Sequence, residues 1–400
     1  MSLIAETLYF VIPFVLVISI VIVIHELGHY WAGRYFGAAV ESFSVGFGNS
    51  IFETRDKNNT RWRLNWLPLG GFVSFVNEGG VIENEGHPKE HASELSQLDE
   101  SEMPVGRAFT ELSPGARIIV ALAGPFANFI TAIIVFAFIA VFLGNPIQKI
   151  SIAGIEEGSA AEEAGLQVDD IFLQVNGRNA DQMSVILEEI KMSSNDEVDL
   201  LMQRDGAEVL VPVTPRRVTR TNGLNIKERT GMIGVQLQPV TVDQNKLNPV
   251  EAVGFGVSET FSTIGSSLEM MGRIIVGKES LQQLSGPVGI ASVTGNITKA
   301  TMQQDDVSLG RRIYALTVTM VQFIAFISVA IGFFNLLPLP ILDGGLVVFN
   351  TYEALTGKGL SEELLLKTKF ATLLVLAALA IFITLGDFEE AGLLELFRGL

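Results

Sequence analysis

Four apolar stretches, each close to the length of a membrane-spanning helix, constrain this chain more than any other feature. An α-helix needs about 20 residues to cross the hydrocarbon core of a bilayer. The second and third stretches exceed that length without a charge, and the first and fourth reach it with their flanks. We therefore predict an α-helical polytopic membrane protein with about four transmembrane helices. The stretches are Leu8–Ile24, Ile118–Leu143, Ile313–Leu342 and Phe370–Leu385.

The first stretch could also be a signal peptide. It has Glu6 in place of a basic n-region, and no small-residue cleavage site follows it. We therefore expect a retained transmembrane helix.

Composition narrows the chemistry of any functional site. Of the 400 residues, 48% are hydrophobic and 18% are charged, against roughly 25% charged in soluble proteins. The net charge of −17 argues against nucleic-acid binding, which needs clustered positive charge. Cysteine is absent, which excludes disulfides and thiolate metal sites. A metal ion must therefore be held by carboxylates and by the four histidines, His25, His29, His87 and His91.

The sequence His25-Glu26-Leu27-Gly28-His29 lies at the end of the first apolar stretch. Residues i and i+4 of a helix lie one turn apart on the same face, so both imidazoles can bind one zinc ion. Glu26 is offset by about 100° and can reach a water molecule at the metal as a general base. The same pattern could serve only solvation or capping of a helix. Ionisable groups are costly in a membrane segment, however, and there they indicate function.

A catalytic zinc site needs a third protein ligand, and Asp343 is the candidate. It closes the sequence that runs from Asn335 through Pro338 and Pro340 at the end of the third stretch. The prolines remove backbone donors and predict a broken helix, which is tolerated at membrane depth where it lines a cavity. Alone, Asp343 would be an ordinary turn residue before two glycines. Together with the histidine pair, it is predicted to be a ligand.

These two motifs resemble the site-2 protease family of intramembrane zinc metalloproteases. The resemblance implies that His25, His29 and Asp343 hold one Zn²⁺ per chain and that Glu26 activates the water. It also implies regulated intramembrane proteolysis of single-pass membrane proteins, such as anti-sigma factors, or of remnant signal peptides. The resemblance covers nearly the whole chain and includes Gly46-Phe47-Gly48, Leu69-Gly70-Gly71-Phe72, Gly124-Pro125-x-x-Asn128 and Ser285-Gly286-Pro287.

The segment between the second and third stretches resembles a PDZ domain, as in the bacterial branch that controls the envelope-stress sigma factor. The resemblance implies that this domain excludes substrates with bulky ectodomains, so that another protease trims them first. Whether it filters by size or binds a specific peptide stays open. Two features depart from the family: Leu346 replaces a histidine of many relatives, and only one PDZ domain is recognisable. The PDZ-like sequences are Gly158–Leu166, Asp169-Asp170-Ile171 and Val175-Asn176-Gly177.

Five residues are candidates for contact with the substrate. Asn335 and Asn128 are polar residues of apolar segments and can hydrogen-bond a substrate, although bonding between helices explains them equally well. A transmembrane substrate must unwind before cleavage, and a strand edge can bind its freed backbone groups by β-addition. Gly70, Gly71 and Phe72 match the family's re-entrant β-loop and are the candidates for that edge. A plain interfacial hairpin is the alternative.

We expect seven segments along the chain. They are a first helix with the histidine pair, a strand-rich membrane-associated loop with a β-hairpin region and an acidic excursion, and a second helix. Four segments follow: an inserted α+β PDZ domain, a C-terminal extension of the PDZ domain with amphipathic segments, a third helix, and a loop with a fourth helix. His87 and His91 fall in the acidic excursion, where Pro88 favours a solvated loop over a metal site. The boundaries are 1–35, 36–112, 113–145, 146–217, 218–312, 313–345 and 346–400.

The resemblance implies a bacterial inner-membrane protein with its active site toward the cytoplasm and its PDZ domain in the periplasm. The basic residues after the first helix agree with this orientation, whereas Arg311 and Arg312 do not. Two other functions compete. A catalytically dead adaptor would have no need of Glu26, and a transporter is disfavoured because no inverted repeat is apparent.

Overall fold

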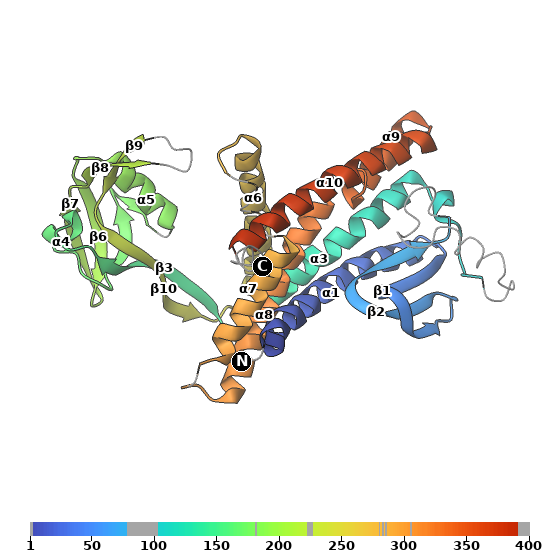
Figure 1. The fold of residues 1–400 in the computed structure, drawn as a ribbon, viewed down its shortest axis with the longest axis horizontal. Coiled ribbons are helices and arrows are strands. Elements are labelled where there is room, and N and C mark those ends of the chain that lie inside the picture. Colours follow the sequence, from blue (N-terminus) through green and yellow to red (C-terminus); the bar gives the residue numbers. More distant parts are fainter. Residues whose placement is uncertain are drawn as a thin grey trace. The chain divides into compact units, whose positions relative to one another are not determined.

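The computed structural model describes residues 3–390 apart from 78–102, 181, 222–226, 280, 282–283, 285 and 305. His87, His91, Ser285 and most of the acidic excursion lie outside the described residues. The chain forms two compact units (Figure 1). The membrane unit contains Met1–Phe138 and Pro249–Leu400, and the inserted unit contains Ile139–Asn248.

Four helices of the described chain are long and apolar enough to cross a bilayer, in agreement with the prediction. Few of the residues in their apolar windows are buried inside the protein, as expected for surfaces that face lipid. The helices are α1 (Leu3–Tyr35), α3 (Pro114–Phe142), α8 (Leu309–Asn335) and α10 (Glu362–Glu390). Their candidate spans are Tyr9–Tyr35, Pro114–Phe142, Leu309–Asn335 and Glu363–Gly386.

Helix α3 packs closely on both α1 and α8. A Cβ atom at Gly28 of α1 would lie 2.8 Å from Cβ of Ala127, and one at Gly332 of α8 would lie 2.8 Å from the ring of Phe129. Small residues at such crossings let helix backbones approach in a membrane, where no hydrophobic effect drives helices together. The glycines therefore set the spacing of the helices that carry the site.

The third apolar stretch breaks at its prolines, as predicted. Helix α8 ends at Asn335, and a new helix, α9 (Asp343–Thr356), begins at Asp343. Gly345 permits the close approach of the two ends of this break, because a Cβ atom there would lie 2.8 Å from Cα of Pro340. The segment after 345, expected to be a loop, continues α9 as far as the left-handed Gly357.

The strand-rich loop forms the antiparallel strands β1 (Val40–Arg55) and β2 (Arg61–Phe75). Phe43 of β1 pairs with both Trp62 and Val73, so the first part of β1 lies between the two ends of β2. No other strand in the described part of the chain pairs with Gly71–Ser74. That segment is therefore a sheet edge.

A short helix, η2 (Phe109–Glu111), precedes α3, and two longer helices precede α8. Helix α6 (Pro249–Ile275) buries Ala252, Gly256 and Thr260, which are spaced four residues apart and so lie along one side. Helix α7 (Pro287–Met302) packs against α1, and its Gly295 accommodates the ring of Phe10.

The inserted unit is an antiparallel sheet with strand order β10-β3-β4-β6-β7, in which β5 also pairs with β4, and a separate β8–β9 pair. Its buried core includes Ile152, Phe172, Ile186 and Leu200. The unit extends past the expected boundary at 217, because β10 pairs with β3 along its whole length. The elements are β3 (Asn145–Ile155), α4 (Ala160–Glu163), β4 (Ile171–Val175), β5 (Arg178–Asn179), α5 (Met183–Met192), β6 (Val198–Arg204), β7 (Ala207–Val213), β8 (Arg216–Thr221), β9 (Lys227–Met232) and β10 (Val235–Asn245).

Candidate metal centre

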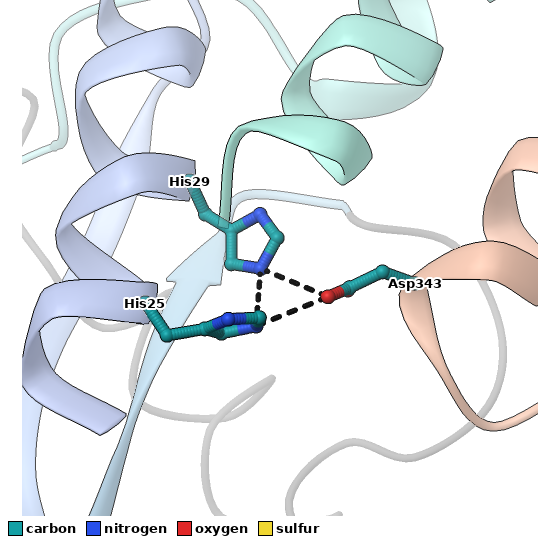
Figure 2. Close-up of side chains that lie close together, drawn as sticks. All are labelled: His25, His29 and Asp343. Atoms are coloured by element: carbon teal, nitrogen blue, oxygen red, sulfur yellow. Dashed lines mark hydrogen bonds and ion pairs between the residues drawn. The ribbon is translucent and has the colours of Figure 1, made fainter. Parts of the chain in front are cut away.

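His25, His29 and Asp343 converge from two helices of the membrane unit (Figure 2). The histidines lie one turn apart on α1, within its candidate span, and both are buried. Asp343 is the first residue of α9 and points at the two rings. Nε2 of His25 lies 3.1 Å from Nε2 of His29, and Oδ2 of Asp343 lies 3.0 Å and 3.5 Å from these two atoms.

These three donor atoms suit a zinc ion. Around a tetrahedral zinc with bonds of about 2.0–2.1 Å, neighbouring donor atoms lie about 3.3 Å apart. The observed separations of 3.0, 3.1 and 3.5 Å surround that value. Apart from its contacts with the two imidazole nitrogens, the buried Oδ2 of Asp343 has no partner among the described residues, so a cation would satisfy it. Three protein ligands would leave one position open for water or substrate.

The second ring nitrogen of His29 is held by α3. Nδ1 lies 2.8 Å from the carbonyl oxygen of Val120, which can only accept a hydrogen bond. Nδ1 must therefore carry the hydrogen, and the lone pair of Nε2 points to the metal position. Helix α3 thus orients the His29 ring through its main chain.

Gly124 of α3 leaves the space that the two rings occupy. A Cβ atom built there would lie 2.6 Å from Cε1 of His29 and 2.8 Å from Nε2 of His25. Any other residue at this position would displace a ring. Gly124 therefore belongs to the site, although it offers no donor atom.

Glu26 lies beside the histidines and contacts the sheet edge. Its Oε2 accepts a hydrogen bond of 3.0 Å from the backbone N–H of Val73. Because Phe43 of β1 pairs with the other side of Val73, this N–H points away from the sheet and toward α1. The hydrogen bond brings a carboxylate of the motif and an unpaired strand edge together.

A cavity of about 430 Å³ opens onto these residues. Phe72 and Asn335, two of the five candidate substrate residues, line it together with Leu346. Gly70 and Gly71 belong to β2 but do not line the cavity. Asn128 is fully buried, and its Nδ2 lies 3.3 Å from Nδ1 of His25. The structure thus places Asn128 against a histidine instead of on the cavity wall.

Sequence reasoning missed the groups that surround the three donor atoms. Main-chain groups of Val120 and Val73 carry no side-chain signature. Gly124 was noted as part of the family resemblance but given no role, although a glycine in an apolar helix marks a close approach. Arg117 was also missed: it lines the cavity and pairs with Glu353 of α9 at 2.6 Å.

Comparison with known proteins identifies the family. The sequence profile of peptidase family M50 matches residues 13–376. The chain belongs to this family. As an M50 peptidase of the site-2 protease type it is a zinc metalloprotease, and its four apolar helices make it a multi-pass membrane protein.

Relatives of this M50 protein match it along nearly its whole length. The protein mll0638 of Mesorhizobium japonicum, whose name describes a zinc metalloprotease, is 33% identical over 94% of this chain and 97% of its own. Metalloprotease MmpA of Caulobacter vibrioides is 31% identical over 98% of both chains. Among solved structures, the PDZ domain of the SdrC-like protein Lin2157 of Listeria innocua matches 25% of this chain and 99% of its own. That match has 14% identity and a TM-score of 0.18, too low to bear on the fold.

Proposed function

We propose that this protein cleaves membrane-spanning segments of other proteins, with one zinc ion per chain held by His25, His29 and Asp343. The observation that carries the proposal is the convergence of three donor atoms, two of them on histidines within a candidate membrane span, next to the Glu26 carboxylate. A hydrolytic metal site buried among apolar helices is suited to substrates that lie in the bilayer.

Each protein group has a distinct task. A bound zinc ion supplies a Lewis acid for the scissile carbonyl and acidifies the attacking water. Glu26 takes the proton of that water on its carboxylate and passes it to the leaving amine. Asn335 lines the cavity, and we assign it a hydrogen bond to the substrate backbone.

The sheet edge at Gly71–Ser74 is the proposed substrate track. A helix that enters the site must unwind, and its backbone groups then need partners because lipid offers none. The edge supplies them by β-addition. Phe72 lies at the cavity and would contact the substrate's side chains. Gly70 and Gly71 allow the strand to turn and approach closely, with φ of +91° at Gly70.

Single-pass membrane proteins of the anti-sigma-factor type, or remnant signal peptides, are the proposed substrates. The inserted unit resembles a PDZ domain in sequence, and we assign it the exclusion of untrimmed substrates. Trimming by another protease would then precede cleavage. We further propose a bacterial inner-membrane location, with the catalytic residues toward the cytoplasm and the inserted unit in the periplasm. The basic residues of the hairpin, including Arg55, Lys57 and Arg61, support this orientation.

Replacement of the general base tests the proposal. Purified wild-type protein and Glu26→Gln are compared for zinc content and for cleavage of a labelled single-pass membrane protein. Glu363→Gln, an exposed site at the start of α10, is the matched control. We expect the wild type and the control to cut, and Glu26→Gln to keep zinc without cutting. Zinc binding without cleavage of any trimmed substrate would favour an adaptor, and absence of zinc would refute the site.

A further inference from the structure

Asn128 is the buried polar residue that faces His25. It lies on α3, is 0% exposed, and places Nδ2 3.3 Å from Nδ1 of His25. Its other terminal atom, Oδ1, is buried and has no hydrogen-bond partner among the described residues. A buried amide oxygen without a partner is unfavourable, so this arrangement calls for an explanation.

The protonation state of a metal-binding histidine supplies that explanation. If Nε2 of His25 binds zinc, the neutral ring carries its hydrogen on Nδ1, which can then only donate. In the structure, the atom nearest to Nδ1 is the amide nitrogen of Asn128, which is also a donor. The nitrogen and oxygen of an amide have nearly the same shape, and a 180° rotation of the group exchanges them. After this rotation Oδ1 faces His25, and both the orphaned oxygen and the opposed donors disappear.

We propose that Asn128 is a positioning residue whose Oδ1 accepts a hydrogen bond from Nδ1–H of His25. This bond fixes the tautomer that leaves the Nε2 lone pair for the metal. The proposal rests on the zinc site of the proposed function and deepens it. It assigns Asn128 to the orientation of a ligand instead of to contact with the substrate.

The arrangement at His29 supports this assignment independently. There the acceptor for Nδ1–H is the carbonyl oxygen of Val120, at 2.8 Å. Val120, Gly124 and Asn128 are spaced four residues apart, so they lie on one face of α3. Val120 supplies an acceptor to the His29 ring, the amide of Asn128 contacts the His25 ring, and Gly124 between them leaves room for both rings. One face of α3 would thus orient both histidines of the motif.

The alternative is that the amide of Asn128 keeps its nitrogen toward His25. In it, Nδ2 of Asn128 donates to an unprotonated Nδ1, and His25 then carries its hydrogen on Nε2, 3.0 Å from Oδ2 of Asp343. A ring in that tautomer cannot bind a metal through Nε2. The two alternatives differ in whether zinc binding through Nε2 of His25 depends on an acceptor at position 128: it does in the first, and it does not in the second.

Zinc affinity of the full-length protein separates them. Affinities are measured by competition with a chelator for the wild type, Asn128→Asp and Asn128→Leu, with thermal unfolding as the check of fold. Aspartate keeps an oxygen acceptor at the same place, whereas leucine keeps the volume without one. Ser328→Ala is the matched control, because Ser328 is also a buried polar residue of the bundle without a partner among the described residues.

We expect Asn128→Leu to weaken zinc binding by about 10- to 100-fold, and Asn128→Asp and Ser328→Ala to bind nearly as tightly as the wild type. Equal affinity of Asn128→Leu and the wild type would overturn the proposal, as would equal losses in the leucine and aspartate variants. If Asn128→Leu does not fold, Asn128→Ala replaces it under the same criteria. If the wild type binds no zinc, the zinc site itself fails. If the wild type binds zinc and Glu26→Gln behaves as expected, one of the overturning results for the Asn128 variants would refute the role of Asn128 alone and leave the proposed function intact.

Discussion

Gly124 lies on the face of α3 that the two imidazoles approach, so a methyl group there tests whether the observed ring positions matter. A Cβ atom would lie 2.6 Å from Cε1 of His29. Non-bonded carbon atoms meet at about 3.5 Å, so Gly124→Ala must displace this ring by about 0.9 Å, the difference of the two distances. Retreat is opposed because Nδ1 of His29 is hydrogen-bonded to Val120.

This displacement is large for a catalytic site. A shift of about 1 Å in a positioned group can lower a reaction rate roughly 100-fold. We therefore expect Gly124→Ala to cut at about 1% of the wild-type rate or less, with weaker zinc binding. The helix itself should not suffer, because alanine is favoured over glycine in helices by about 1 kcal/mol. The assays are cleavage of a labelled single-pass protein and chelator competition for zinc.

Gly115 provides the control on the same helix. A Cβ atom there would meet nothing within 4 Å, so Gly115→Ala should leave both zinc affinity and cleavage unchanged. If Gly124→Ala bound zinc and cut as well as Gly115→Ala, the argument from ring positions would be refuted. Loss of activity in both variants would instead indicate a general sensitivity of α3.

Two further predictions concern the hairpin. Val73→Pro removes the N–H that bonds Glu26 and prevents pairing at this edge, so cleavage should fall while zinc remains bound, whereas Val73→Ala should retain activity. A proline variant that cuts normally would exclude the edge as the substrate track. Burial alone would raise the pKa of Asp56, but hydrogen bonds from Asn58, Trp62, Thr60 and Tyr30 hold it below its usual range. A depressed pKa adds stability above the unfolded pKa of about 4 that is lost as the pH falls through the folded pKa. The difference in thermal midpoint between wild type and Asp56→Asn should therefore be constant above about pH 5 and narrow below about pH 4; a difference that widens on acidification would contradict this.

The sequence carries its strongest information where chemistry and membrane physics coincide. The four spans could be predicted because an apolar stretch of about 20 residues is typical of a helix that crosses the bilayer. The break after Asn335 could be predicted because Pro338 and Pro340 cannot continue a helix. The structure brings Asp343 to the histidine pair, as the two motifs together suggested, and its role as a ligand stays a prediction.

Pairing between distant strands and contacts made by main-chain atoms could not be predicted in the same way, because no residue pattern in the sequence indicates them. The PDZ domain was expected to end at 217 and to be followed by a C-terminal extension. Nothing in Val235–Asn245 reveals that this segment pairs with β3, some 90 residues earlier. For Asn128, contact with a substrate and bonding between helices explained the sequence equally well, because its contact with His25 depends on how α1 crosses α3. That crossing is set by Gly28, whose importance is visible only beside Ala127.

Val73 connects the proposed substrate track to the proposed base. Oε2 of Glu26 accepts the hydrogen bond from the N–H of Val73, and it thereby occupies the place that a substrate carbonyl would take on pairing at this edge. A substrate strand that binds Val73 would displace Glu26 and free its carboxylate next to the unwound backbone. The carboxylate would then be released only when an extended chain is present, and a helical segment in the same cavity would leave it engaged. Val73→Pro removes this link without touching a donor atom of the metal site, so its zinc content and cleavage rate together show whether the link matters.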